Sequence, residues 1–186
     1  MRDIGGAINA GAGKDEKRKG IMKIIIEKEK DLKKNTQKRK KVMIKEFQKK
    51  LRIKLFRNKE GYDQMIAQVE IPFLALCEHH EISFEGEVSV AYIPDKWLTG
   101  LSKLARIVEY FLNPTVKTIQ ERATYQILNC LIKALNPKGV MVVIKARHSC
   151  ICYRGIKKPS LTITSAVYGN FKDNPITRQE FLSLIK

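Results

Sequence analysis

The sequence ISFEGEVSVAYI, at residues Ile82–Ile93, places an apolar residue or a glycine at every second position, with serine or glutamate between most of them. A period of two is typical of a β-strand that buries one face. Pro94 follows and closes the stretch. Residues Ile66–Leu76, just before it, are also rich in β-forming residues. The pattern therefore predicts two strands joined by a corner at Cys77–Glu81.

The remaining pattern predicts two helices, two further strands and a short last helix. Apolar residues recur at helical spacing in the first two of these segments, and Asn-Pro pairs end both. The predicted elements are helices at Gly100–Leu112 and Thr118–Leu135, strands at Val140–Cys152 and Leu161–Phe171, and a helix at Thr177–Ile185. The order ββααββ indicates an α+β protein, with an antiparallel sheet and two helices on one face.

The N-terminal third differs from the rest in charge. Up to Arg57 there are 20 Lys and Arg against 7 Asp and Glu, out of a net charge of +17 for the whole chain. Helical spacing of apolar residues predicts a helix at Val42–Phe56, and the Gly/Ala-rich start, 1–14, is predicted to be disordered. We expect residues 1–60 to be a lysine-rich extension, partly disordered and partly helical, and 61–186 to be the globular domain.

Composition narrows the class of protein. No apolar run approaches the roughly 20 residues that a membrane-spanning helix needs, and the first twenty residues lack the apolar core of a signal peptide. We therefore expect a cytoplasmic protein without a membrane partner. In that compartment four cysteines indicate thiols or metal ligands, not disulfides.

Cysteine and histidine gather in two short segments. Cys77 and His80 form a Cys-x-x-His pair at a predicted strand end, a common source of two zinc ligands. If Val140–Cys152 is a regular strand, His148, Cys150 and Cys152 project to one face together with Arg154. The spacing leaves two interpretations open: a catalytic zinc with three protein ligands, or a structural site with Cys152 as the fourth.

Two helix starts carry charged residues. Glu121 fits a capping box with Thr118, or could accept hydrogen bonds from adjacent N–H groups of a base such as guanine. Ser102, Lys103 and Arg106 open the earlier helix, where they could form a solvated basic face or bind phosphate.

From Ile71 to Lys186 the sequence resembles the GTP cyclohydrolase I family. The motifs that carry the resemblance occur in the same order as in that family. They are Cys77-Glu78-His79-His80, Ala91-Tyr92-Ile93-Pro94, Gly100 to Glu109, Gln120-Glu121-Arg122, His148-Ser149-Cys150, Arg154-Gly155 and Thr177 to Leu182.

The resemblance implies a fold, a reaction and an assembly. The fold is the tunnelling fold, in which subunits join their sheets into a barrel and two rings stack, commonly as a decamer, with active sites between subunits. The reaction is the zinc-dependent hydrolysis of GTP to 7,8-dihydroneopterin triphosphate and formate, an early step toward tetrahydrofolate, other pterins or deazapurines.

The resemblance also assigns roles. Cys77, His80 and Cys150 would bind one zinc ion per subunit, which activates the water that attacks carbon 8 of guanine. The other expected roles are proton transfer by His79 and His148, contact with the guanine edge by Gln120 and Glu121, and contact with the ribose and triphosphate by Ser102, Lys103, Arg106 and Arg154. Cys152 has no role in the family.

Two alternatives belong to other classes of protein. A non-catalytic, nucleotide-binding relative with the same fold would keep the pocket without turnover. A basic nucleic-acid-binding protein would use residues Lys17–Arg57, where salt-dependent contact with phosphates is expected.

Overall fold

A computed structural model describes residues 34–47 and 50–185 of the chain, so the predicted disordered start lies outside the described residues. The chain divides after Glu46 into two units, which are described separately. In the first unit, residues 34–46 are helical and almost all are exposed.

The predicted helix at Val42–Phe56 is right only in its first part. The helix runs over 34–47, while residues 50–54 have no regular structure and Leu55–Arg57 forms strand β1. Leu51, Ile53 and Leu55 pack against the main core at every second position. Leu51 and Leu55 have the spacing of a helix, but together with Ile53 they also fit the period of two of an extended chain. The extended form occurs because it packs all three against the core.

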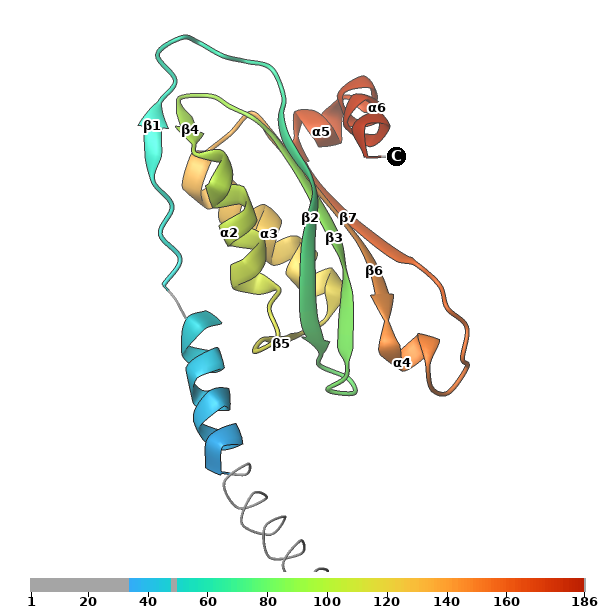
Figure 1. The fold of residues 1–186 in the computed structure, drawn as a ribbon. Helices are drawn as coiled ribbons and strands as arrows, with labels where there is room; N and C mark the ends of the chain where they lie inside the picture. Colours follow the sequence, from blue (N-terminus) through green and yellow to red (C-terminus); the bar gives the residue numbers. More distant parts are fainter. Residues whose placement is uncertain (1–33, 48–49, 186) are drawn as a thin grey trace, which may run out of the picture. The chain divides into compact units, whose positions relative to one another are not determined.

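The second unit is built on a five-stranded sheet with the order β5-β2-β3-β6-β7 (Figure 1). Only β5 runs parallel to its neighbour, and the other pairs are antiparallel. A two-stranded sheet joins β1 to β4. The strand bounds are β2 Ile66–Cys77, β3 Ser83–Ile93, β4 Trp97–Thr99, β5 Lys117–Thr118, β6 Gly139–His148 and β7 Thr162–Gly169.

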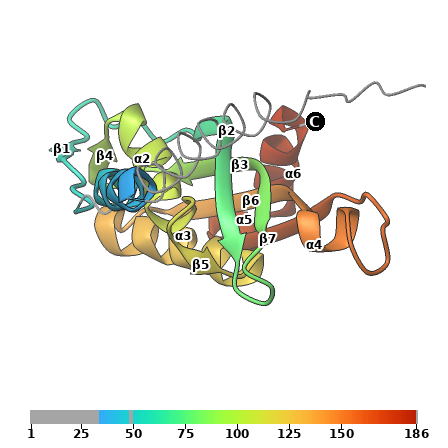
Figure 2. The same cartoon turned by 60° about the horizontal axis from the view of Figure 1, so that its bottom comes forward.

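Helices α2 (Leu101–Phe111) and α3 (Gln120–Leu135) cover one face of this sheet, and α5 (Asn170–Asp173) with α6 (Pro175–Leu184) lies on the other (Figures 1 and 2). The predicted fold class, an antiparallel sheet with two helices on one face and a short C-terminal helix, is confirmed.

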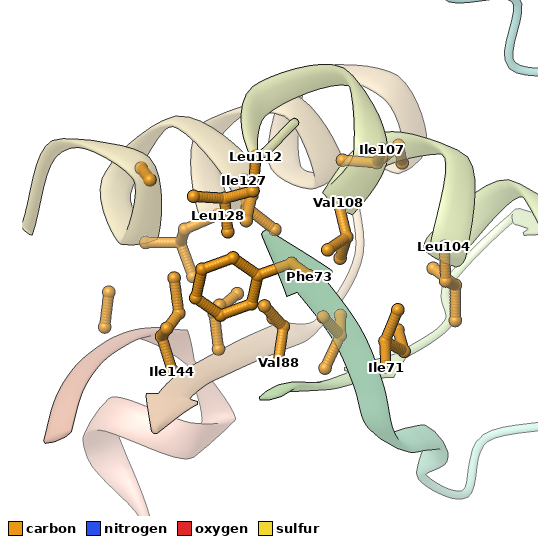
Figure 3. Packing of buried hydrophobic residues seen from close by; sticks show 14 of the residues in the cluster. Ile71, Phe73, Val88, Leu104, Ile107, Val108, Leu112, Ile127, Leu128 and Ile144 are labelled. Carbon is orange, nitrogen blue, oxygen red and sulfur yellow. The ribbon is translucent and has the colours of Figure 1, made fainter. Parts of the chain in front are cut away.

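The main core lies between the sheet and the two long helices. Phe73 of β2 is 8% exposed, and its ring lies between Leu112 and Ile127 on the helical side and Val88 and Ile144 on the sheet (Figure 3). A smaller cluster lies on the opposite face, where Phe171 and Phe181 of α5 and α6 pack edge to face. Burial on both faces explains why β3 and β6 are almost continuously apolar at the end that α5 and α6 cover.

Helix α3 begins two residues later than predicted. Ile119 is its N-cap and makes no side-chain capping bond, so the predicted capping box between Thr118 and Glu121 is wrong. Thr118 belongs instead to β5, where it lies opposite Cys77 in the parallel pairing with β2. The helix ends at Asn136, which has the left-handed conformation (φ 45°) that suits asparagine.

Gly86 is required by close contact between strands. A Cβ atom at this position would lie 2.0 Å from the carbonyl oxygen of Lys145 and 2.7 Å from Cα of Ala146, both backbone atoms of β6. Backbone cannot move aside as a side-chain end can, so any larger residue would separate β3 from β6.

We therefore expect Gly86→Ala to lower the free energy of unfolding by about 1–3 kcal/mol through overpacking. Gly100→Ala is the matched control: a Cβ there meets nothing within 4 Å, and its loss should be only about 0.5 kcal/mol, from the weaker N-cap. Thermal unfolding of both variants at one protein concentration measures the difference. Equal melting temperatures would contradict the close contact.

Candidate active site

A pocket of about 260 Å³ lies where β2, β6 and the start of α3 come together. Four segments supply its walls: the turn after β2, the first turn of α3, the end of β6 with α4 (Ser149–Cys152), and the start of β7. Its lining residues are Cys77, His79, His80, Ile119, Gln120, Glu121, His148, Cys150, Ile151 and Thr162. The pocket thus gathers seven of the residues that the sequence singled out.

Two thiols and an imidazole form the centre of the pocket. The possible ligand atoms of Cys77, His148 and Cys150 all lie within 4.8 Å of one another. Burial raises the pKa of the Cys150 thiol, and the neighbouring Cys77 raises it further through its charge and a hydrogen bond. Sulfur and imidazole ligands suit zinc, and a bound cation would hold both thiols as thiolates. The donor set therefore fits the metal that the resemblance implies.

Cys150 reaches this cluster because β6 stops early. The predicted strand to Cys152 is wrong: β6 ends at His148, opposite Phe84, and residues 149–152 form the single turn α4. On the other side β7 first pairs at Thr162, opposite Ala146, so beyond His148 the strand has no partner. The turn brings Cys150 back toward Cys77, while Cys152 lies outside the cluster.

The histidine turn between β2 and β3 is held firmly. The amide of Glu81 donates to the carbonyl of Cys77 (2.7 Å), and Glu81 has a left-handed φ of 55°. Two ion pairs flank the histidines: Glu78 with Arg122, and Glu81 with Lys117 at 2.5 Å. These contacts fix the turn to α3 and β5, although its histidines remain exposed.

The two adjacent histidines point differently. Nδ1 of His79 lies 3.8 Å from Sγ of Cys77. The ring of His80 lies 6.3 Å from that of His79, and His80 lines the pocket without joining the close cluster. His148, and not His80, thus belongs to the close cluster with the two thiols.

His148 is enclosed by the protein. It is 9% exposed, and its ring is stacked on Phe84 at 4.6 Å with an angle of 6° between the planes. Burial lowers the pKa of His148, the Glu121 carboxylate opposes that change, and His79 adds to the lowering. These surroundings favour the neutral form of His148. The alternation in β3 predicted Phe84 only as a core residue, so its stacking on His148 was missed.

Gln120 and Glu121 occupy the first turn of α3 but differ in exposure. The Gln120 side chain is 2% exposed and contacts His148 through Oε1, 2.8 Å from Nε2. Glu121 is exposed and lines the pocket, at a helix start where negative charge is favoured. Of the two, Glu121 is the side chain available to a ligand.

Three of the four predicted phosphate-binding residues lie away from the pocket. Ser102, Lys103 and Arg106 open α2 beside β4, at the end of the sheet opposite α4 (Figure 1). Arg154 is exposed in the loop after α4 and, like those three, is not among the residues that line the pocket. Among the described residues, the pocket lining contains no lysine or arginine.

The family is decided by comparison with known sequences. The profile of the family described as GTP cyclohydrolase I matches residues 13–186. The chain belongs to the GTP cyclohydrolase I family. Proteins named GTP cyclohydrolase 1 from Aquifex aeolicus (strain VF5) and Pelotomaculum thermopropionicum (strain DSM 13744 / JCM 10971 / SI) are each 50% identical to it. The matches span 136 residues (72% of each chain) and 129 residues (68% of each chain).

Among solved structures, the apo form of the archaeosine synthase QueF-Like aligns with a TM-score of 0.43 at 17% identity, over 55% of this chain and 92% of that one. In the part of the chain that the structure describes, no helix has the length and apolar character to span a bilayer.

Cys150→Ser should remove most of the bound zinc, because an alcohol replaces one of the two thiolates. Cys152→Ser is the matched control: it changes the same atom two residues away, outside the cluster, and should leave the zinc content unchanged. Elemental analysis of both variants after dialysis measures this. Zinc loss from the Cys152 variant alone would contradict the site.

Proposed function

We propose that this chain catalyses the hydrolysis of GTP to 7,8-dihydroneopterin triphosphate and formate. The observation that carries the proposal is the pocket, which joins two thiols, three histidines and Glu121 in a member of the GTP cyclohydrolase I family. The alternatives, a non-catalytic relative or nucleic-acid binding through the lysine-rich segment, stay predictions.

Cys77, His80 and Cys150 would hold one zinc ion per subunit. The two thiols already lie together, and His80 is an exposed side chain on the rim of the same pocket that can turn toward them. When bound, zinc supplies Lewis-acid activation of the water needed at carbon 8 of guanine. The ring of His148 is bonded to Gln120 at Nε2 and stacked on Phe84. We therefore assign His148 to proton transfer and not to the metal.

His79 and His148 would carry the protons of the reaction. Burial lowers the pKa of His148 and so favours its neutral ring, in which one nitrogen can accept a proton as the imidazole ring of guanine opens. His79 is exposed beside Cys77, where it can exchange protons with solvent. General acid–base groups of this kind contribute about 10²–10⁴-fold to a rate.

Glu121 would recognise the guanine. Its carboxylate lies at the pocket rim and accepts hydrogen bonds only, which matches the two adjacent N–H donors of the guanine edge. This contact would orient carbon 8 toward the thiol cluster.

Ser102, Lys103, Arg106 and Arg154 would bind the ribose and triphosphate, with arginine and lysine as permanent phosphate-binding charges. The first three lie at the opposite end of the sheet from the pocket, so we propose that they act on GTP held by a neighbouring subunit. This division supports a homo-oligomer, such as a two-ring decamer. We also propose a cytoplasmic location, with the product feeding pterin, folate or deazapurine synthesis.

Incubation of zinc-loaded protein with GTP should release formate and an oxidisable, fluorescent pterin triphosphate in equal amounts. A chelator should abolish both, and zinc added back should restore them. Zinc-loaded, folded protein that forms neither product would contradict the proposed reaction and favour a binding-only relative.

The third zinc ligand can be assigned with two histidine variants. His80→Asn should lose most of the zinc, whereas His148→Asn should keep it and still lose turnover. Zinc content and formate release are measured on the same samples. The reverse result, with zinc lost only from His148→Asn, would make His148 the ligand, as its place in the cluster also allows.

A further inference from the structure

A buried hydrogen-bond network lies directly behind His148. Nε2 of Gln120 lies 3.1 Å from each of three oxygens: the carbonyls of Ile144 and Thr162 and the hydroxyl of Thr164. Its Oε1 lies 2.8 Å from Nε2 of His148. One side chain of α3 is thus bonded to β6, to β7 and to a residue of the pocket.

The surroundings fix which end of the Gln120 amide is nitrogen. The backbone carbonyls of Ile144 and Thr162 can only accept hydrogen bonds, so the group facing both of them must be the NH₂ group. The amide oxygen therefore faces His148. A rotated amide would set three oxygens against one another in a buried site.

The threonines complete a directed circuit. Thr124 donates its hydroxyl to the carbonyl of Gln120 at 2.8 Å, so the hydroxyl of Thr164, 2.7 Å away, donates to Thr124. The oxygen of Thr164 is then free to accept from Gln120, which agrees with the amide orientation. The amide of Gln120 and both threonine hydroxyls therefore find their hydrogen-bond partners within this network.

The circuit determines which tautomer the neutral imidazole ring of His148 adopts. An amide oxygen carries no hydrogen, so Nε2 of His148 must donate to it. In the neutral ring the other nitrogen, Nδ1, then has a free lone pair, and no hydrogen-bond partner for it is found among the described residues. Stacking on Phe84 holds the plane of the ring.

We propose that Gln120 is a positioning residue, which holds His148 in its Nε2–H tautomer so that Nδ1 is the proton-accepting atom, and that its side chain does not contact guanine. The side chain is 2% exposed and both ends of its amide are bonded within the protein. Recognition of the base is left to Glu121. The kinetic part of this inference rests on the proposed function, whereas the tautomer does not.

The tautomer is measured on the wild-type protein without substrate. The chain has three histidines, so solid-state ¹⁵N spectra of the zinc-loaded, ¹⁵N-histidine-labelled protein at pH 8 contain three imidazole pairs, and His148→Asn identifies the pair of interest. We expect a protonated Nε2 and an unprotonated Nδ1. A protonated Nδ1 on neutral His148 would overturn the proposal.

Variants then separate positioning from substrate binding. Gln120→Met should lower kcat by about 10- to 100-fold, as removal of an orienting partner commonly does, with KM for GTP little changed. Glu121→Gln should instead raise KM. Thr164→Val leaves Gln120 its two carbonyl partners, so it should lower kcat less than Gln120→Met does.

A double-mutant cycle provides the last test. If Gln120 acts through His148, Gln120→Met should have no further effect on kcat in a His148→Asn background. Additive losses of kcat in the double variant, or a rise in KM with kcat unchanged in Gln120→Met, would overturn the proposal. Either result would indicate that Gln120 contacts guanine. If Gln120→Met does not fold, the spectra of the wild-type protein still decide. Inactive wild-type protein would overturn the proposed function while leaving those spectra interpretable.

Discussion

The antiparallel pairing of β3 with β6 runs unbroken from Phe84 opposite His148 to Ile93 opposite Gly139. Side chains alternate along both strands, so a shift of one residue would move every core residue to the wrong face. The same register stacks Phe84 on His148 and ends β6 where the site begins. The core and the pocket thus depend on one alignment of two strands, and the absence of a side chain at Gly86 lets those strands approach.

Charge is distributed unevenly between the N-terminal segment and the pocket. Most of the net charge of +17 belongs to the segment before Arg57, while the pocket lining carries one carboxylate and no lysine or arginine among the described residues. The polar atoms deepest in the site, those of Gln120 and His148, are bonded to one another and to backbone. In a low-dielectric setting such a satisfied network resists rearrangement, which makes its geometry a fixed property of the fold.

Much of the fold followed from periodicity. The long strand at Ile82–Ile93 and the helix at Gly100–Leu112 were predicted within a residue or two, because their apolar residues keep one period over their full length. The helix at Val42–Phe56 was overextended because its last part also suits an extended chain. The end of β6 could not be predicted, because it depends on where its partners in β3 and β7 stop. The same holds for the site: residue types and family motifs indicated Cys77, His80 and Cys150 as ligand candidates and His148 as an acid–base group, whereas the Gln120 network consists of contacts among α3, β6 and β7 that no local pattern reports.

The two thiols of the pocket come from Cys77 and Cys150, which meet only through β3, the strand between β2 and β6. Neither the β2–β3 hairpin nor the single turn of α4 contains both sulfurs. The two sulfurs come together only once β2, β3 and β6 have paired, and long-range pairing of this kind is slow because of the chain entropy it costs. A cation that needs both sulfurs is therefore captured by the completed domain and not by a folding fragment. Its binding free energy then adds to the stability of the whole sheet. The supply of metal would therefore set the lifetime of the folded protein as well as its activity.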